Sequence, residues 1–139
     1  MVDGNLSFGL SVLATAMAIY AICQTNKNIE FNQFQIILNL YSSLKDIEKD
    51  LFKYQVDGEF ESCVLYEFTQ ETICNHYEIC CTHYLRGSIN RKLFRDLFKA
   101  NIIRVVDNKD YKMFFYPEDK VKYDYCNVLE VYNKFKVIK

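Results

Sequence analysis

The hydrophobic pattern begins with an apolar stretch that no charge interrupts. No charged residue lies between Asp3 and Lys27, and Leu, Ile, Val, Ala, Met, Phe and Tyr make up most of this stretch. A helix rises about 1.5 Å per residue, so about twenty residues cross a hydrocarbon core of about 30 Å. We therefore expect one transmembrane helix over residues 6–24, preceded by a short tail over residues 1–5.

Two other interpretations of this stretch stay open. A cleaved secretion signal requires a positive start, a shorter apolar run and a small-x-small cleavage site. Here the start contains Asp3 and no Lys or Arg, and bulky Ile22 and Cys23 follow the candidate site around Ala18 and Ala21. A buried helix of a soluble protein is the other alternative, but the stretch shows no polar face. The pattern favours the uncleaved anchor.

The orientation follows from the basic residues near the ends of the span. Such residues tend to stay on the cytoplasmic side, and Lys27, Lys45 and Lys49 follow the span while no Lys or Arg precedes it. An odd number of cysteines follows the span, as expected where thiols stay reduced: Cys63, Cys74, Cys80, Cys81 and Cys126. We expect a single-pass protein of the cell membrane, with its N-terminus outside and its C-terminal domain in the cytoplasm.

Beyond the span, apolar residues recur every three or four positions. From Phe34 to Leu51 this spacing predicts an amphipathic helix over about residues 31–54, and Asp57 with Gly58 makes a break. A second helix is predicted over about residues 59–84. Its expected core positions are Phe60, Val64, Glu67 or Phe68, Cys74, Tyr77, Cys81 and Tyr84 or Leu85.

The rest of the chain predicts two more helices. Gly87 ends the second helix, and Ser88 is the predicted cap of a third helix with Leu93, Phe94, Leu97 and Phe98 in its apolar stripe. Residues 102–106 fit a short strand or a helix end, and residues 107–110 a turn. Pro117 is expected in the first turn of a last helix. Its core positions would be Val121, Tyr125, Val128, Tyr132 and Phe135.

These elements predict an all-α protein, with an N-terminal transmembrane helix followed by a small bundle of about four helices. Residues 25–33 would form a juxtamembrane linker and residues 34–139 one helical domain. From Lys27 onward, seventeen basic residues meet seventeen acidic ones, so the domain is neutral as a whole. Its length permits one compact core.

One cluster has the residue types of a metal site. Both histidines and three of the six cysteines lie within ten residues: Cys74, His76, Cys80, Cys81 and His83. On a helix, His76, Cys80 and His83 share one face, while Cys74 and Cys81 share another. A structural zinc site needs four donors, so one more would come from elsewhere, such as Cys63, Cys126 or Glu78. The usual zinc spacings are absent, and we favour cysteines in the core and half-buried or surface histidines, with no cofactor.

The same residues contain the types that nucleophilic catalysis needs. Cys80 with His76 or His83 and an orienting Glu78 would be a thiol, a base and an acid. Neighbouring turns of one rigid helix do not present this geometry in a pocket, so we expect no catalytic residues and no enzyme. Glu71 and Glu78 are expected to be structural acids rather than a catalytic pair.

Positive charge is concentrated in one segment. Residues 86–104 contain all four arginines, two lysines and a single acid, Asp96. The six cations are Arg86, Arg91, Lys92, Arg95, Lys99 and Arg104. Arg91, Arg95 and Lys99 would lie in line opposite the apolar stripe and could face anionic lipid. The alternatives are a solvated face or ion pairs with Glu59, Glu61, Glu67 and Glu71. Nucleic-acid binding is not expected, because the domain is neutral and has no reading motif.

Part of the chain resembles a known kind of protein. After the span come Asn75-His76-Tyr77-Glu78, then Arg86-Gly87-Ser88-Ile89, then Leu93, Phe94, Leu97, Phe98, Ile102 and Ile103. This order resembles a family of small bacterial and phage membrane-anchored proteins whose helical domain has no assigned function. The resemblance covers roughly residues 34–132. It implies a single-span protein of unknown activity, with Asn75, Tyr77 and Glu78 as the matching positions.

A physical role is expected for these three positions. Asn75 and Glu78 stand three apart on one helix face, so both could bond backbone groups near Ser88 or before Pro117. A buried Glu78 would need a partner such as Arg86, Arg91 or Arg104. We favour a structural clamp, with a partner-binding surface as the alternative.

These observations predict a membrane-anchored helical protein without a recognisable activity. We expect a scaffold, a regulator or a phage-related accessory protein that acts through contacts with an unidentified protein partner. The alternative is a membrane-tethered zinc protein that uses the cluster at residues 74–83.

Overall fold

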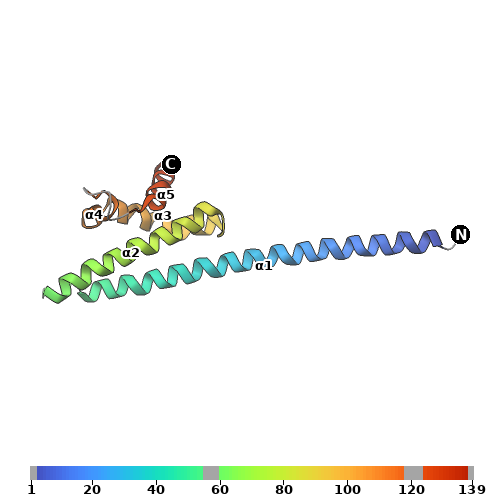
Figure 1. The fold of residues 1–139 in the computed structure, drawn as a ribbon, viewed down its shortest axis with the longest axis horizontal. Coiled ribbons are helices and arrows are strands. Elements are labelled where there is room, and N and C mark those ends of the chain that lie inside the picture. The colour runs from blue at the N-terminus through green and yellow to red at the C-terminus, as the bar shows by residue number, and fades with distance from the viewer. Residues whose placement is uncertain (1–2, 55–59, 118–123, 138–139) are drawn as a thin grey trace. The chain divides into compact units, whose positions relative to one another are not determined.

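The computed structural model describes residues 3–54, 60–117 and 124–137, and these ranges contain helices and no strands. Side chains are described for residues 13–53, 63–117 and 124–137. The helices are α1 (Asp3–Tyr54), α2 (Phe60–Arg86), α3 (Arg91–Asp107), the short 3₁₀ helix η1 (Lys109–Tyr111), α4 (Lys112–Phe115) and α5 (Cys126–Val137) (Figure 1). The prediction of an all-α fold is therefore confirmed.

The first helix is longer than the pattern suggested. Residues 25–33, the predicted linker, lie within α1 and are helical. Neither Gly nor Pro occurs between Gly9 and Gly58, so nothing in the covalent chain breaks the helix there. The chain divides into two compact units, Met1–Gln33 and Phe34–Lys139, and α1 contributes to both.

The predicted transmembrane span, residues 6–24, lies within α1. In the part of the chain that the structure describes, no helix is long and apolar enough to cross a membrane. Residues 6–12, which begin the predicted span, lie outside the described side chains. The transmembrane segment over residues 6–24 therefore stays a prediction.

The core of the second unit takes buried side chains from α1, α2, α3, η1, α4 and α5. Ile37 and Leu44 of α1 are fully buried, and Figure 1 shows this part of α1 beside α2. Four stacked or edge-on rings join α2, α3 and α5. The ring of Phe94 lies 4.8 Å from that of Tyr84 and 4.7 Å from that of Phe98, and Phe135 lies 5.7 Å from Tyr84. These aromatic contacts hold the three helices around one core.

The buried face of α2 is shorter than predicted. Cys74, Tyr77, Cys81 and Tyr84 are buried as expected. Val64 is exposed, and so are both alternatives for the next position, Glu67 and Phe68, so these two core assignments are wrong; Phe60 lies outside the described side chains. Among the described residues of α2, the buried face begins only at Thr69 and Gln70.

The turn between α2 and α3 is partly as predicted. Gly87 has φ +70°, the left-handed conformation that closes a helix, which confirms its role. The cap of α3 is Asn90, whose side chain accepts a hydrogen bond from the Leu93 N–H at 3.0 Å, so the assignment of Ser88 as cap is wrong. Ser88 instead donates its hydroxyl to the His83 carbonyl at 3.1 Å.

The segment after the third helix differs from the prediction. Residues 102–106 belong to α3, so the alternative of a strand is wrong: Ile102, Val105 and Val106 continue its buried stripe. Asn108 then ends α3 and caps η1 by accepting the Asp110 N–H at 3.0 Å.

The last helix begins later than predicted. Pro117 follows α4 and precedes α5, which starts at Cys126, so Pro117 is not in its first turn. The predicted core positions Tyr125, Val128, Tyr132 and Phe135 are all buried, whereas Val121 lies outside the described residues.

Candidate functional site

The two histidines of the predicted metal cluster bond to different partners. His76 places Nε2 at 2.7 Å from the carbonyl oxygen of Leu40 in α1, and therefore donates its N–H there. His83 places Nδ1 at 2.8 Å from the Ser88 hydroxyl in the turn before α3. The histidines are thus bonded to two different segments of the body instead of converging.

The three clustered cysteines are core residues. Cys74, Cys80 and Cys81 have no exposed surface. Burial raises the pKa of the Cys80 thiol to about 12, and raises the pKa values of Cys74 and Cys81 above their usual range. Metal binding and nucleophilic attack both use the thiolate, so all three thiols are in the unreactive form at neutral pH.

A metal site is therefore not assembled by the described residues. No group of three or more His, Cys, Asp or Glu side chains that could hold a metal ion occurs among them. The donors proposed from elsewhere are also unsuited: Cys63 and Cys126 are exposed, and Glu78 accepts hydrogen bonds from α5.

Glu78 has a specific structural partner, the N-terminus of α5. Its Oε1 accepts the Asn127 backbone N–H at 3.1 Å and an Asn127 side-chain N–H, and its Oε2 accepts the Val128 N–H at 3.0 Å. The first turn of α5 contains no acidic residue of its own. A carboxylate from α2 thus satisfies N–H groups of α5 that its first turn leaves unpaired and lies at the positive end of its dipole.

Asn75 extends this contact one turn further along α2. Its Oδ1 accepts the hydroxyl of Tyr125, the residue before α5, at 3.0 Å. On the other side, the Asn127 side chain also donates to the Thr82 hydroxyl at 3.1 Å. Asn75, Glu78 and Thr82, spaced four or three apart on α2, together form what we call the α5 clamp.

The clamp is the kind of contact that the sequence predicted, but its partner differs. The polar groups bond to the start of α5 and not to the region around Ser88 or the loop before Pro117. Glu78 is satisfied by N–H donors, so none of the expected arginines pairs with it. Arg104 lies 3.7 Å from Glu48 instead.

Tyr77, the third matching position, lies inside the core. Its side chain is fully buried, and its hydroxyl has no hydrogen-bond partner among the described residues. Burial raises the pKa of this hydroxyl above its usual range, and the negative charge of nearby Glu48 adds a smaller effect in the same direction. Tyr77 therefore packs in the core and offers no group at the surface.

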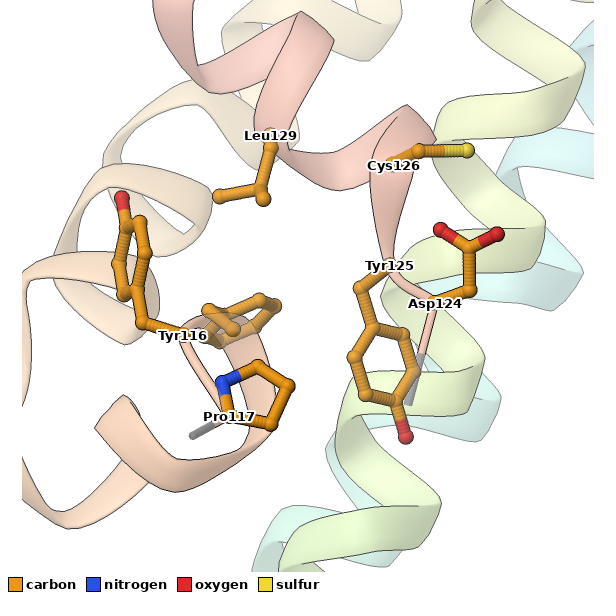
Figure 2. Close-up of a pocket in the computed structure, with 7 residues that line it drawn as sticks. Tyr116, Pro117, Asp124, Tyr125, Cys126 and Leu129 are labelled. Atoms are coloured by element: carbon orange, nitrogen blue, oxygen red, sulfur yellow. The ribbon is translucent and has the colours of Figure 1, made fainter. Parts of the chain in front are cut away.

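A pocket of about 530 Å³ lies between the end of α4 and the start of α5 (Figure 2). Figure 2 shows Tyr116 and Pro117 on one side, and Asp124 and Cys126 on the other with their polar ends turned away from these two residues. Partial desolvation raises the pKa of the exposed Cys126 thiol, and the charge of Asp124 adds a smaller effect in the same direction. Both effects disfavour the thiolate form of the one thiol that lines this pocket.

A second pocket of about 470 Å³ is formed by α1, α2, α3 and η1, and charged groups line it. Glu48 is their centre, with Lys45 Nζ at 2.6 Å and an Arg104 nitrogen at 3.7 Å. Glu48 therefore pairs with both cations, and Asp110 in the same lining supplies the second negative charge.

A third, smaller pocket is a groove between α1 and α2. Its volume is about 240 Å³, and its lining is Ile47, Asp50, Leu65, Phe68, Thr69 and Thr72. Phe68 is 66% exposed and Leu65 is 43% exposed. We call this feature the α1–α2 groove. Sequence reasoning missed it, because the spacing of Phe68 placed that residue in the core.

The basic residues of α3 are on its outer face. Arg91, Lys92 and Arg95 are exposed and Lys99 is half-buried. Within the described ranges, Arg91 and Arg95 form no ion pair with Glu67 or Glu71, whereas Glu59 and Glu61 lie outside the described side chains. The guanidinium of Arg91 lies 5.9 Å from the centre of the Tyr84 ring.

Comparison with known proteins identifies no relative. No family model matches the chain, and neither a curated protein nor a solved structure matches it.

Proposed function

We propose that this protein is a membrane-anchored helical protein that acts through contacts with other proteins. The observation that carries the proposal is the surface of α1 between Leu13 and Cys23. Every residue of this stretch is exposed, and its large side chains are apolar: Leu13, Met17, Ile19, Tyr20 and Ile22.

These side chains surround the helix instead of forming one stripe. At about 100° per residue, Leu13 and Met17 lie on one side and Ile22 lies on the opposite side. Four alanines and Thr15 fill the positions between them, and charged residues begin only at Lys27. A helix that is apolar all round is stable when lipid or protein covers it, which supports the anchor predicted over residues 6–24.

The α1–α2 groove supports the second half of the proposal. Exposed aromatic rings beside a concave apolar surface are typical of protein interfaces, where one anchored side chain fills a pocket. The groove has room for about one large side chain, and Asp50 at its edge supplies a polar rim. The zinc alternative has no comparable support, since the histidines and cysteines of residues 74–83 bond or pack elsewhere in the body.

Membrane extraction tests the anchor. The full chain is expected in the membrane pellet after carbonate treatment and ultracentrifugation, and only detergent should release it. Leu13→Arg with Met17→Arg should move it to the supernatant, because both positions lie near the centre of the predicted span, where each Arg disfavours insertion by about 3 kcal/mol. Asn26→Arg with Asn28→Arg adds the same charge beyond the apolar stretch and should leave the chain in the pellet.

If the unmodified chain is found in the supernatant without detergent, the proposal of a membrane anchor is wrong.

Capture from detergent-solubilised membranes tests the partner contact. The expected result is one or more proteins that bind the unmodified chain and are lost from Phe68→Asp. Val137→Asp changes a still more exposed apolar residue outside the groove and is the control. Partners that bind the Phe68→Asp and Val137→Asp variants equally well would exclude the groove as the contact surface.

A further inference from the structure

We infer that the turn between α2 and α3 and the outer face of α3 form a docking surface for an anionic lipid bilayer. The surface consists of Arg86, Arg91, Lys92 and Arg95, which we call the basic surface. All four side chains are exposed. The inference rests on the proposed membrane anchor and adds a second, electrostatic attachment of the body.

The basic surface is electrically unlike the rest of the described body. Most lysines elsewhere pair closely with a carboxylate, with Nζ–O distances of 2.5 to 3.2 Å at Lys45, Lys49, Lys53, Lys134 and Lys136. Arg86, Arg91, Lys92 and Arg95 form no ion pair with any described residue. Asp96 is the one acid between residues 86 and 104. Four cations thus face solvent with one neighbouring negative charge.

The turn after α2 has one cation at its start and another at its end. Gly87, in its left-handed conformation, follows Arg86 directly and lies so close to α3 that a side-chain carbon added there would meet an Arg91 guanidinium nitrogen at 3.7 Å. Arg91 therefore folds back over the end of α2, where it also lies against the Tyr84 ring. Arg86 is the last residue of α2 and Arg91 the first of α3, so one short turn separates the two cations along the chain.

The position of these charges does not favour the stability of the fold. Arg91 and Lys92 occupy the first turn of α3, where the helix dipole is positive, and that turn contains no acidic residue. Cations in a first turn are electrostatically unfavourable, and like charges near one another repel. An external anion offsets both effects, because its negative charge attracts the cations and the helix terminus together.

A bilayer fits this surface better than a small anion or a nucleic acid. All four side chains are exposed, so the surface is open to a flat partner. The whole chain carries a net charge of −1, so long-range attraction to a free polyanion is weak. A membrane anchor removes this difficulty, because it holds the body at high effective concentration beside the headgroups. There each cation favours contact with an acidic leaflet by about fivefold.

Lysine labelling in lipid nanodiscs tests the inference on the full chain. Nanodiscs of phosphatidylcholine alone are compared with nanodiscs of equal parts phosphatidylcholine and phosphatidylserine. A water-soluble acetylating reagent and mass spectrometry then report the rate at Lys92 relative to Lys134. We expect the Lys92 rate to fall about fivefold or more in the anionic nanodiscs. The protection should disappear in about 1 M salt, where the Debye length is about 3 Å.

Two variants separate the basic surface from net charge. The first variant combines Arg86→Gln, Arg91→Gln and Arg95→Gln. It retains Lys92 as the reporter, and the protection of Lys92 from acetylation should disappear. The second variant combines Lys45→Gln, Lys49→Gln and Lys53→Gln, which removes the same number of charges from α1, and the protection of Lys92 should remain. All six residues are exposed or half-exposed, so circular dichroism should show both variants folded. Equal loss of protection in the two variants would overturn the inference.

The experiment also distinguishes this inference from the anchor. If the chain enters neutral nanodiscs and Lys92 is labelled equally in both lipids, the basic surface is not a bilayer contact, although the anchor stands. If the chain binds only anionic nanodiscs and leaves them in high salt, the anchor is wrong and the basic surface is supported.

Discussion

The two ends of α1 show how differently one helix can use apolar side chains. Between Leu13 and Ile22, apolar residues lie on every side of the helix and all are exposed. Between residues 34 and 54, the apolar residues lie mainly along one stripe, and Ile37 and Leu44 in that stripe are fully buried. The first region is more apolar, yet only the second has a core. Periodicity, rather than hydrophobicity, decides which part of a helix can be covered by its own domain.

The largest expected contrast is in thiol reactivity. Cys80 and Cys81 in the body should react with a thiol reagent more than about a hundredfold more slowly than Cys63, because burial raises their pKa values and the body must open first. Cys23, in the first region of α1, should react at a rate that urea leaves unchanged. Mass spectrometry of the full chain in mild detergent measures each site. Equal rates at Cys80 and Cys63 would contradict the buried assignment.

Matched truncations should give the largest contrast in stability. Phe94→Ala removes a fully buried ring between Tyr84 and Phe98 and should lower the free energy of unfolding by about 3–5 kcal/mol. Phe31→Ala makes the same chemical change at a ring that is 62% exposed. It should change the free energy of unfolding by less than about 0.5 kcal/mol. Urea unfolding followed by near-ultraviolet circular dichroism provides both values. Similar losses in the two variants would contradict the burial of Phe94 and the exposure of Phe31.

The α5 clamp should have an intermediate effect. Glu78→Ala leaves the N–H groups of Asn127 and Val128 unpaired and should lower the free energy of unfolding by about 1–3 kcal/mol. Glu67→Ala removes an exposed carboxylate from the same helix and should change it by less than about 0.5 kcal/mol. Amide hydrogen exchange should localise the loss to the first turn of α5. Unchanged exchange there would show that Glu78 does not hold α5.

The smallest expected effect depends on pH. The Tyr132 hydroxyl and then Lys136 bond to Asp107 and hold the pKa of its carboxyl below the ordinary value of 3.8. A lowered folded-state pKa stabilises the fold above the unfolded pKa, and this stabilisation is lost as pH falls through the folded pKa. Asp107→Asn should therefore be less stable than the unmodified chain at neutral pH, with the difference shrinking below about pH 4.

Urea unfolding at several pH values measures the effect of Asp107→Asn. Asp96→Asn, at an exposed acid of the same helix, is the control and should show no such convergence at low pH. A difference between Asp107→Asn and the unmodified chain that stays constant down to pH 2 would exclude a role for the Asp107 charge.

Local sequence signals located the helices well. Gly87 marks the end of α2 because only a residue without a side chain adopts its left-handed conformation freely. Spacing also identified the buried faces of α3 and α5, since Phe94 and Phe98, or Val128 and Tyr132, recur with the helix period. The start of the last helix was missed, because Pro117 is compatible with a first helical turn and equally with a loop.

The candidate site depended on contacts that spacing does not reveal. Glu78 and Asn127 are 49 residues apart, and no local pattern indicates that one caps the helix of the other. The Cys and His cluster had the composition of a metal site, but the helix turns His76 toward α1 and His83 toward Ser88. Phe68 has the spacing of a core residue, yet too few neighbouring elements surround it.

The sequence by itself determined the helical class, the ends of several helices and the apolar character of the first stretch, because these depend on interactions within a few turns. Only the tertiary structure decided which polar side chains are satisfied, which aromatic rings are covered and where the unpaired cations gather. Those properties depend on which helices lie against one another, and helices distant in sequence are brought together by packing of the whole core.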